Sequence, residues 1–244
     1  KQMGTGRSYT IKELASYSFL LEHFYIVDET TSMTKQDLNG TKLVTMDLSA
    51  KLGKEEPLVL IYHTHGSETY KKVNGKEGSV IEVGTALTKE LENVYGIKTV
   101  HDKSVYDMVD GQLDRNAAYN FAGDSVEAAL RKNPSVKVVI DLHRDSVENN
   151  IHLRTKINGK SAAQIMFFNG VSRLASKGDI GYLYNPNKEA NLAFSLQMQL
   201  LAEEKYPDLT RKIFLKGLRY NLHVRPRSAL VEVGAQTNTL EEAL

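Results

Sequence analysis

Short apolar runs alternate with longer amphipathic stretches along most of the chain. Runs of apolar residues predict strands at 58–62, 97–100, 136–140, 163–168 and 229–231. Apolar residues at helical spacing predict helices between them, at 80–95, 116–132 and 188–206. Because strands that alternate with helices are typical of an α/β fold, we expect a single domain with a mostly parallel, twisted sheet flanked by helices.

The first 56 residues follow this pattern less clearly. Residues 9–25 have apolar positions at roughly helical spacing, whereas residues 28–40 are polar, rich in threonine and expected to form a loop. We expect residues 1–56 to form a cap or extension that packs on a core domain of residues 57–244.

Composition limits the chemistry that this chain can perform. A hydrophobic content of 41% in 244 residues is enough for a sizeable core, and a formal net charge of +1 gives no sign of nucleic-acid binding. The absence of cysteine excludes disulfides and thiolate metal sites, so a metal would be held by His, Asp or Glu. No apolar run is long enough to span a bilayer.

Residues that zinc accepts as ligands occur at the ends of three predicted strands. They are His63-Thr64-His65 after the first strand, Asp141-Leu142-His143 after the third, and Glu232 in the last. In open α/β sheets, ligands bind at the carboxyl ends of the strands. Imidazole and carboxylate are the zinc ligands that remain when thiolate is absent. The pattern therefore indicates a zinc site with three protein ligands and a further carboxylate as general base.

These residues also have ordinary structural interpretations. His63 and His65 lie on the same face of a strand, so one could be a ligand and the other a supporting hydrogen-bond donor. A glutamate at position 82, in the first turn of a predicted helix, simply complements the helix dipole. Glu232 is more telling, because an unpaired carboxylate in an apolar strand is costly. We interpret the remaining histidines as surface or core residues: His23, His101, His152 and His223.

Four motifs, in the same order, give the chain a resemblance to a known family. They are Ile61-Tyr62-His63-Thr64-His65, Gly78-Ser79-Val80-Ile81-Glu82-Val83-Gly84, Asp141-Leu142-His143-Arg144-Asp145, and Leu230-Val231-Glu232-Val233-Gly234-Ala235-Gln236-Thr237-Asn238. With these motifs the chain resembles the stage II sporulation protein P family, within the wider amidase-3-type zinc N-acetylmuramoyl-L-alanine amidases. The resemblance implies an amidase-3-like fold.

The resemblance also implies roles for individual residues. It gives the zinc ligands as His65, Glu82 and His143, with Glu232 as the catalytic base. The wider family has Asp-Pro-Gly before its first histidine, where this chain has Tyr62-His63-Thr64, so His63 stays an alternative to His65. Glu68 is likewise an alternative carboxylate ligand. The residues expected to support the ligands or bind substrate are His63, Glu68, Asp141, Arg144 and Arg225.

A reaction and a setting follow from the same resemblance. One zinc ion would activate water to cleave the amide between N-acetylmuramic acid and L-alanine in peptidoglycan during spore engulfment, with stem-peptide cross-links as a second substrate for endopeptidase activity. The resemblance implies an extracytoplasmic protein in the intermembrane space of a sporulating cell, anchored in the membrane through a segment upstream of Lys1. Its expected partners are stage II sporulation proteins D and M.

Two other functions fit part of the pattern. A binuclear metal-dependent amidohydrolase or phosphoesterase of the barrel type also places His-x-His after its first strand, but needs about eight strands. A non-enzymatic cell-wall-binding module could use the same scaffold, although it would have no need for a full ligand set. Metal stoichiometry distinguishes the first alternative from an amidase with one zinc, and peptidoglycan digestion distinguishes the second.

Overall fold

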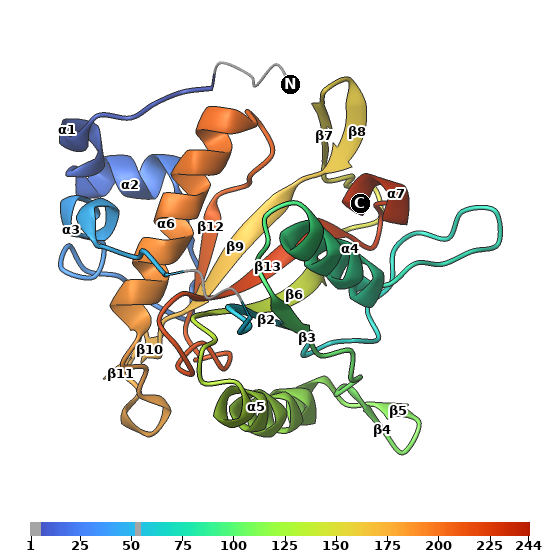
Figure 1. Ribbon diagram of the computed structural model, residues 1–244. Coiled ribbons are helices and arrows are strands. Elements are labelled where there is room, and N and C mark those ends of the chain that lie inside the picture. Colours follow the sequence, from blue (N-terminus) through green and yellow to red (C-terminus); the bar gives the residue numbers. More distant parts are fainter. Residues whose placement is uncertain (1–5, 52–54) are drawn as a thin grey trace. The chain divides into compact units, whose positions relative to one another are not determined.

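The computed structural model describes residues 6–51 and 55–244 (Figure 1). The chain divides into two compact units: unit 1 is Lys1–Ser49 with Gln164–Ala229, and unit 2 is Ala50–Ala163 with Leu230–Leu244. Residues 1–49 thus belong to the same unit as residues 164–229. The boundary expected between residues 56 and 57 stays a prediction.

Unit 2 is built on parallel strands that carry most of the predicted site. These strands are β2 (Val59–Tyr62), β3 (Thr99–His101), β6 (Val138–Asp145) and the Leu230–Ala235 part of β13 (Ser228–Ala235). Their order is β13-β6-β2-β3, and β2 pairs in parallel with both β3 and β6. Every residue of β2 is buried, as expected for a parallel strand covered on both faces.

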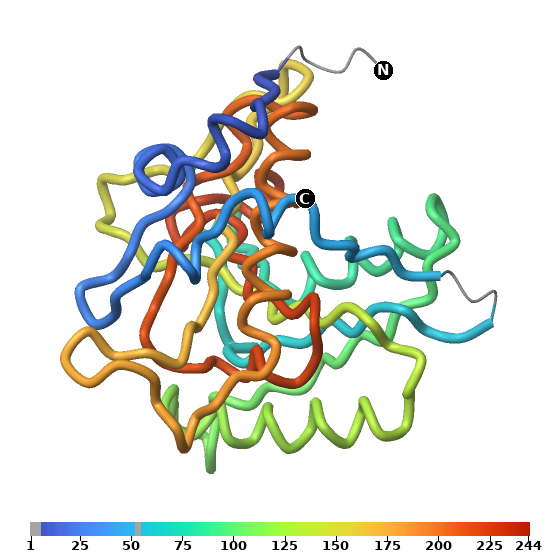
Figure 2. The backbone as a smooth tube through the Cα atoms, turned by 90° about the vertical axis from the view of Figure 1, so that its left-hand side faces the viewer, coloured from blue at the N-terminus to red at the C-terminus, as the bar shows by residue number. Residues whose placement is uncertain are grey.

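Two helices cover these strands. Figure 1 shows α4 (Val80–Asn93) above β2 and β3, and α5 (Arg115–Lys132) below them, and the tube in Figure 2 agrees. The α5 helix begins at Asp114, whose carboxylate accepts hydrogen bonds from the first backbone N–H groups of the helix. It buries one residue per turn against the unit: Ala118, Ala122, Val126 and Leu130. This spacing is the amphipathic pattern that the sequence predicted.

Smaller elements complete unit 2. Two antiparallel hairpins, β4–β5 and β7–β8, and the short helix α7 follow loops of the core. The elements are β4 (Met108–Val109), β5 (Gln112–Leu113), β7 (Arg154–Ile157), β8 (Lys160–Ala163) and α7 (Leu240–Ala243). None of these elements was expected from the sequence.

Unit 1 has its own parallel strands, in the order β1-β12-β9, with the pair β10–β11 apart from them. The strands are β1 (Tyr25–Val27), β12 (Ile213–Lys216), β9 (Ile165–Gly170), β10 (Arg173–Leu174) and β11 (Gly178–Asp179). The long helix α6 (Lys188–Lys205) packs on β9, β12 and the helix α3 (Gly40–Thr45). The remaining elements are α1 (Ile11–Leu14), α2 (Tyr17–His23) and the 3₁₀ turn Gly181–Leu183.

The expected α/β fold with mostly parallel strands and flanking helices is confirmed. The helical stretch expected over residues 9–25 is two helices, because the Ser16 side chain caps a new helix by accepting from the Phe19 N–H. Residues 28–39 contain no helix or strand, in agreement with the expected loop. Within the described residues, none of the helices combines the length and the apolarity that a bilayer crossing requires.

Acidification should lower the stability of the protein by protonating Glu242, a carboxylate of α7. Burial favours the neutral form of this carboxyl, but hydrogen bonds from His152, Thr239, Ser161 and Asn238 outweigh it and lower its pKa from 4.5 to about 2. A lowered folded-state pKa stabilises the protein above the unfolded-state pKa, so the benefit should be lost as pH falls from about 4.5 toward 2. We expect Glu242→Gln to cost roughly 2 kcal/mol at pH 7, and much less near pH 3.

Denaturant unfolding of both proteins from pH 7 to pH 3 measures this difference. A gap between the two unfolding free energies that does not shrink on acidification would show that Glu242 contributes through packing and not through its charge.

Candidate functional site

The histidines expected at the strand ends lie together in unit 2. His65 follows the end of β2, and the paired strand β6 carries His143. Both side chains are buried, and their ring centroids lie 5.2 Å apart at an angle of 87°. This placement agrees with the rule that directs ligand sites to the carboxyl ends of parallel strands.

His143 lies between two buried carboxylates. Its Nε2 is 2.8 Å from Asp141 Oδ1, and its Nδ1 is 3.4 Å from Glu68 Oε2. Burial disfavours the charged imidazole, but the carboxylates of Asp141 and Glu68 outweigh this and raise the pKa of His143 well above its ordinary value. Negative charge is thus concentrated around this ring, as it is around a bound cation.

Other groups hold both carboxylates in place. Asp141 accepts hydrogen bonds from the Thr64 N–H at 2.8 Å and the Thr64 hydroxyl at 2.6 Å. Glu68 accepts from the Arg144 N–H at 3.1 Å and the Arg115 guanidinium at 3.3 Å. Burial would raise the pKa of both carboxyls, but His143 and these donors lower it, so each stays ionised.

Both ring nitrogens of His63 are engaged by the protein. Its Nδ1–H donates to the Leu142 carbonyl at 2.8 Å, so its Nε2 accepts from His101 Nε2, 2.9 Å away. Burial, followed by the charge of His63, lowers the pKa of His101 to about 4, so the pair is neutral near pH 7. Gly84 of α4 makes room for the two rings, because a Cβ there would lie 2.7 Å from both Nε2 atoms.

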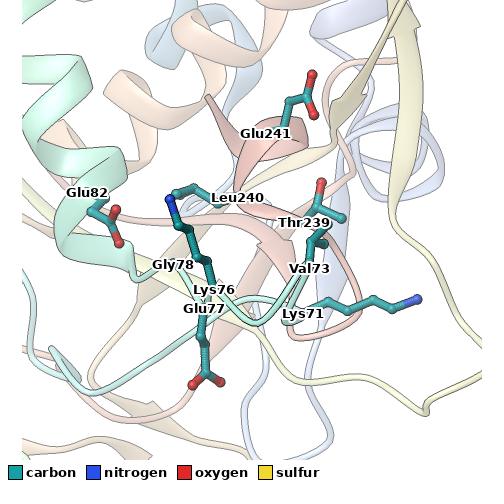
Figure 3. Close-up of a pocket in the computed structure, with 9 residues that line it drawn as sticks. All are labelled: Lys71, Val73, Lys76, Glu77, Gly78, Glu82, Thr239, Leu240 and Glu241. Atoms are coloured by element: carbon teal, nitrogen blue, oxygen red, sulfur yellow. The ribbon is translucent and has the colours of Figure 1, made fainter.

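The Glu82 carboxylate does not face the histidines. It is exposed and accepts a hydrogen bond from the Ser79 N–H at 2.8 Å, which completes a capping box at the start of α4. In Figure 3 it lies on one side of a pocket of about 400 Å³, with Leu240 and the rest of the C-terminal segment on the other side. In this conformation Glu82 acts as a helix cap.

Glu232 lies on β13, the neighbour of the strand that carries His143. The buried Tyr70 connects β13 to the segment after β2, because its hydroxyl donates to the carbonyl of Val233, the residue after Glu232, at 3.0 Å. Burial, and then the negative charges of Glu68 and Glu232, raise the pKa of Tyr70. The two carboxylates therefore act on the same hydroxyl.

A side-chain amide joins the ends of β6 and β13. Gln236 Oε1 accepts from the Val147 N–H at 3.1 Å, and Gln236 Nε2 donates to the Val147 carbonyl. Asn238 closes the turn after β13 by accepting from the Ala235 N–H at 2.9 Å, and Gly234 takes a positive φ of 60° there. This segment is the Gly-Ala-Gln-Thr-Asn end of the fourth motif.

The two arginines expected to bind substrate make backbone hydrogen bonds. Arg144 donates to the carbonyls of Thr69 and Asp145, at 3.0 and 3.2 Å. Arg225 lies in unit 1, where its guanidinium donates to the Val224 carbonyl at 3.1 Å. The structure therefore shows structural contacts for both arginines, and their role toward substrate stays a prediction.

Sequence reasoning missed several residues around the histidines. Asp107 lies 3.8 Å from His65 Nδ1, Tyr119 packs edge-on against the His65 ring, and Arg115 pairs with Glu68. His101, which we interpreted as a surface or core residue, contacts His63. These residues come from a strand, a loop and a helix outside the four motifs, so spacing gave no signal for them.

The donor chemistry of the site fits zinc, although its geometry is not arranged for a metal. His65, His143 and Glu68 are the imidazole and carboxylate donors that zinc accepts, and each is buried beside a further charged group. Across residues 6–51 and 55–244, however, no group of three or more His, Cys, Asp or Glu side chains stands ready to hold a metal ion. A metal would require local adjustment of these side chains.

The molecule is thus an α/β protein with a buried histidine–carboxylate cluster at the ends of parallel strands. The chain belongs to the stage II sporulation protein P family, whose sequence model matches residues 9–244. A curated relative, stage II sporulation protein P of Bacillus subtilis (strain 168), is 28% identical over 204 residues, which cover 77% of this chain and 48% of the relative. The chain therefore spans about half the length of that relative.

Solved structures give weaker similarities. The N-acetylmuramyl-L-alanine amidase Ami1 from Mycobacterium smegmatis has 12% identity and a TM-score of 0.43, with 80% of this chain and 88% of that chain covered. The N-acetylmuramoyl-L-alanine amidase from Clostridium difficile 630 has 18% identity and a TM-score of 0.39, with 77% and 83% covered.

Proposed function

We propose that this protein is a zinc-dependent peptidoglycan hydrolase that cleaves the amide between N-acetylmuramic acid and L-alanine. The observation that carries the proposal is the buried His143 imidazole, held between two carboxylates with the His65 ring beside it. Burying charge is costly, and clusters of buried titratable groups with perturbed pKa values are enriched at functional sites. Membership of the stage II sporulation protein P family supports a substrate in the cell wall.

In this proposal His65 and His143 are the imidazole ligands. His65 is preferred over His63, because both nitrogens of His63 already make hydrogen bonds. His143 Nε2 faces Asp141, which leaves Nδ1, on the Glu68 side, for the metal. Bound zinc would supply a water of lowered pKa and stabilise negative charge on the carbonyl oxygen.

Glu232 is the proposed general base. Its carboxylate takes a proton from the attacking water as the new C–O bond forms at the amide carbon. When the C–N bond breaks, Glu232 gives this proton to the departing amine, so the base is regenerated. Its place on β13, next to the strand of His143, supports this role.

The third ligand is a carboxylate, for which the chain offers two candidates. Glu82 is the ligand implied by the family resemblance, but its carboxylate caps α4. The contacts favour Glu68, which is buried and lies 3.4 Å from His143 Nδ1. We therefore propose Glu68 as the ligand and keep Glu82 as the alternative.

The two glutamine variants separate these candidates. We expect Glu68→Gln to weaken zinc binding at least tenfold, because an amide is a poorer ligand and does not balance the positive charge. Glu82→Gln should leave zinc affinity unchanged, since Gln also completes a capping box. Competition with a chromogenic chelator measures both affinities, and the opposite ranking of the variants would establish Glu82 as the ligand.

Digestion of labelled peptidoglycan tests the function itself. The wild-type protein should release dye with zinc and stop when a chelator is present, and mass analysis of the products should show free stem peptides that begin with L-alanine. Products cut within the stem would instead establish endopeptidase activity. Binding without release would support a wall-binding module, and two metals per chain would support a binuclear hydrolase.

The cellular setting extends this proposal. The family membership supports a role in sporulation. Action during engulfment, anchoring through a segment upstream of Lys1 and partnership with stage II sporulation proteins D and M stay predictions from the resemblance.

A further inference from the structure

Asp107 is a buried loop carboxylate that the proposed chemistry does not yet use. It lies just before β4, yet it is fully buried. The hydroxyl and the N–H of Ser67 donate to it at 2.5 and 3.2 Å. Among the residues that the structure describes, its one ion-pair partner is His65, whose Nδ1 lies 3.8 Å from Asp107 Oδ2. A buried carboxylate with no lysine or arginine beside it requires another explanation.

The facing nitrogen of His65 is equally unusual. His65 Nδ1 is buried and has no hydrogen-bond partner within the described part of the chain. A movement of about 1 Å would bring it to hydrogen-bond distance from Asp107. Because a carboxylate only accepts, such a bond requires the His65 proton to be on Nδ1. The Nε2 lone pair is then available for a ligand.

The same arrangement supports the other histidine. Asp141 lies 2.8 Å from His143 Nε2 and is held by the N–H and hydroxyl of Thr64, as Asp107 is held by the N–H and hydroxyl of Ser67. Thr64 and Ser67 flank His65 in the sequence. One short segment therefore holds two buried carboxylates, each facing one of the two candidate ligands.

We propose that Asp107 is a positioning residue that fixes the tautomer of His65, with the proton on Nδ1 and Nε2 free to bind zinc. This inference rests on the proposed function for the role of the metal. The tautomer itself belongs to the metal-free protein and is tested separately. Histidine ligands commonly donate their second N–H to a carboxylate, and losing that partner weakens metal binding by about 10- to 100-fold.

Asp107→Asn is the variant that tests this inference. The amide keeps an acceptor for Ser67 and has nearly the same shape, but it presents N–H groups to His65 Nδ1. We expect the proton to move to Nε2, which long-range ¹H–¹⁵N spectra of the metal-free protein would show directly. Zinc affinity should fall about 10- to 100-fold, while the melting temperature stays close to that of the wild type.

Two further variants make the result decisive. Asp102→Asn alters a carboxylate in the same loop that bonds Tyr106 and Ser125, and should leave the His65 tautomer unchanged. Ser67→Ala removes the hydroxyl that holds Asp107 without changing any charge, and it should weaken zinc binding by a smaller factor than Asp107→Asn. It replaces Asp107→Asn as the test if that variant does not fold. An unchanged His65 tautomer in folded Asp107→Asn would overturn the proposal. If Asp107→Asn does not fold, a zinc affinity in Ser67→Ala equal to that of the wild type would overturn it. Wild-type protein that binds no zinc would instead overturn the proposed function.

Discussion

Glu232→Gln should abolish peptidoglycan hydrolysis while the protein keeps its zinc. The substitution removes the proposed general base, and general-base catalysis contributes about 10²- to 10⁴-fold. Because glutamine keeps the size of the side chain on β13, we expect little change in stability. Initial rates of dye release from labelled peptidoglycan, with metal content measured on the same samples, test both parts.

Glu90→Gln is the matched control, because Glu90 lies on the exposed side of α4, away from the buried cluster. It should keep the wild-type rate. If the Glu232 variant hydrolyses at a rate close to that of the wild type, another group is the base. If it loses zinc as well as activity, Glu232 is a ligand.

His143→Ala should lose zinc and should also destabilise the protein. It removes one candidate ligand, and it leaves Asp141 and Glu68 as buried carboxylates without their shared partner. Breaking a buried ion pair from one side costs about 3–5 kcal/mol. Metal analysis of the purified variant and its unfolding free energy in denaturant measure the two effects.

His23→Ala serves as the control, since His23 lies at the end of α2 and stacks on Phe19. Its zinc content should equal that of the wild type. Full zinc occupancy in His143→Ala would remove this histidine from the ligand set, and unchanged stability would show that the two carboxylates find other partners.

The long helices and most core strands could be predicted from hydrophobic spacing, because they bury a regular face or a continuous run. The helices α4, α5 and α6 begin and end within two residues of the expected bounds. Strands β1 and β12 were missed. They are three and four residues long and pair only with partners far away in the sequence, so nothing local marks them.

The candidate site, too, could be predicted only in part from the sequence. His65 and His143 were expected from the rule on strand ends, and the structure brings them together. Glu82 illustrates what a motif cannot settle, because a glutamate in the first turn of a helix suits both a cap and a ligand. Asp107 comes from a loop far beyond His65 in the sequence, and only the folded chain shows that it faces the site.

The glycines of the second motif have a physical explanation that the sequence did not reveal. A Cβ at Gly78 would lie 2.4 Å from the Leu240 side chain, and one at Gly84 would collide with His63 and His101. Both positions therefore require the smallest residue so that the C-terminal segment and the histidine pair can approach α4.

The amide of Gln236 pairs both its donor and its acceptor with a single residue's backbone, that of Val147. A side chain therefore continues the hydrogen bonding between the two segments beyond the last residues of β6 and β13. Through this pair of bonds, the segment after β13, the strand of Glu232, is joined to the segment after β6, the strand of His143.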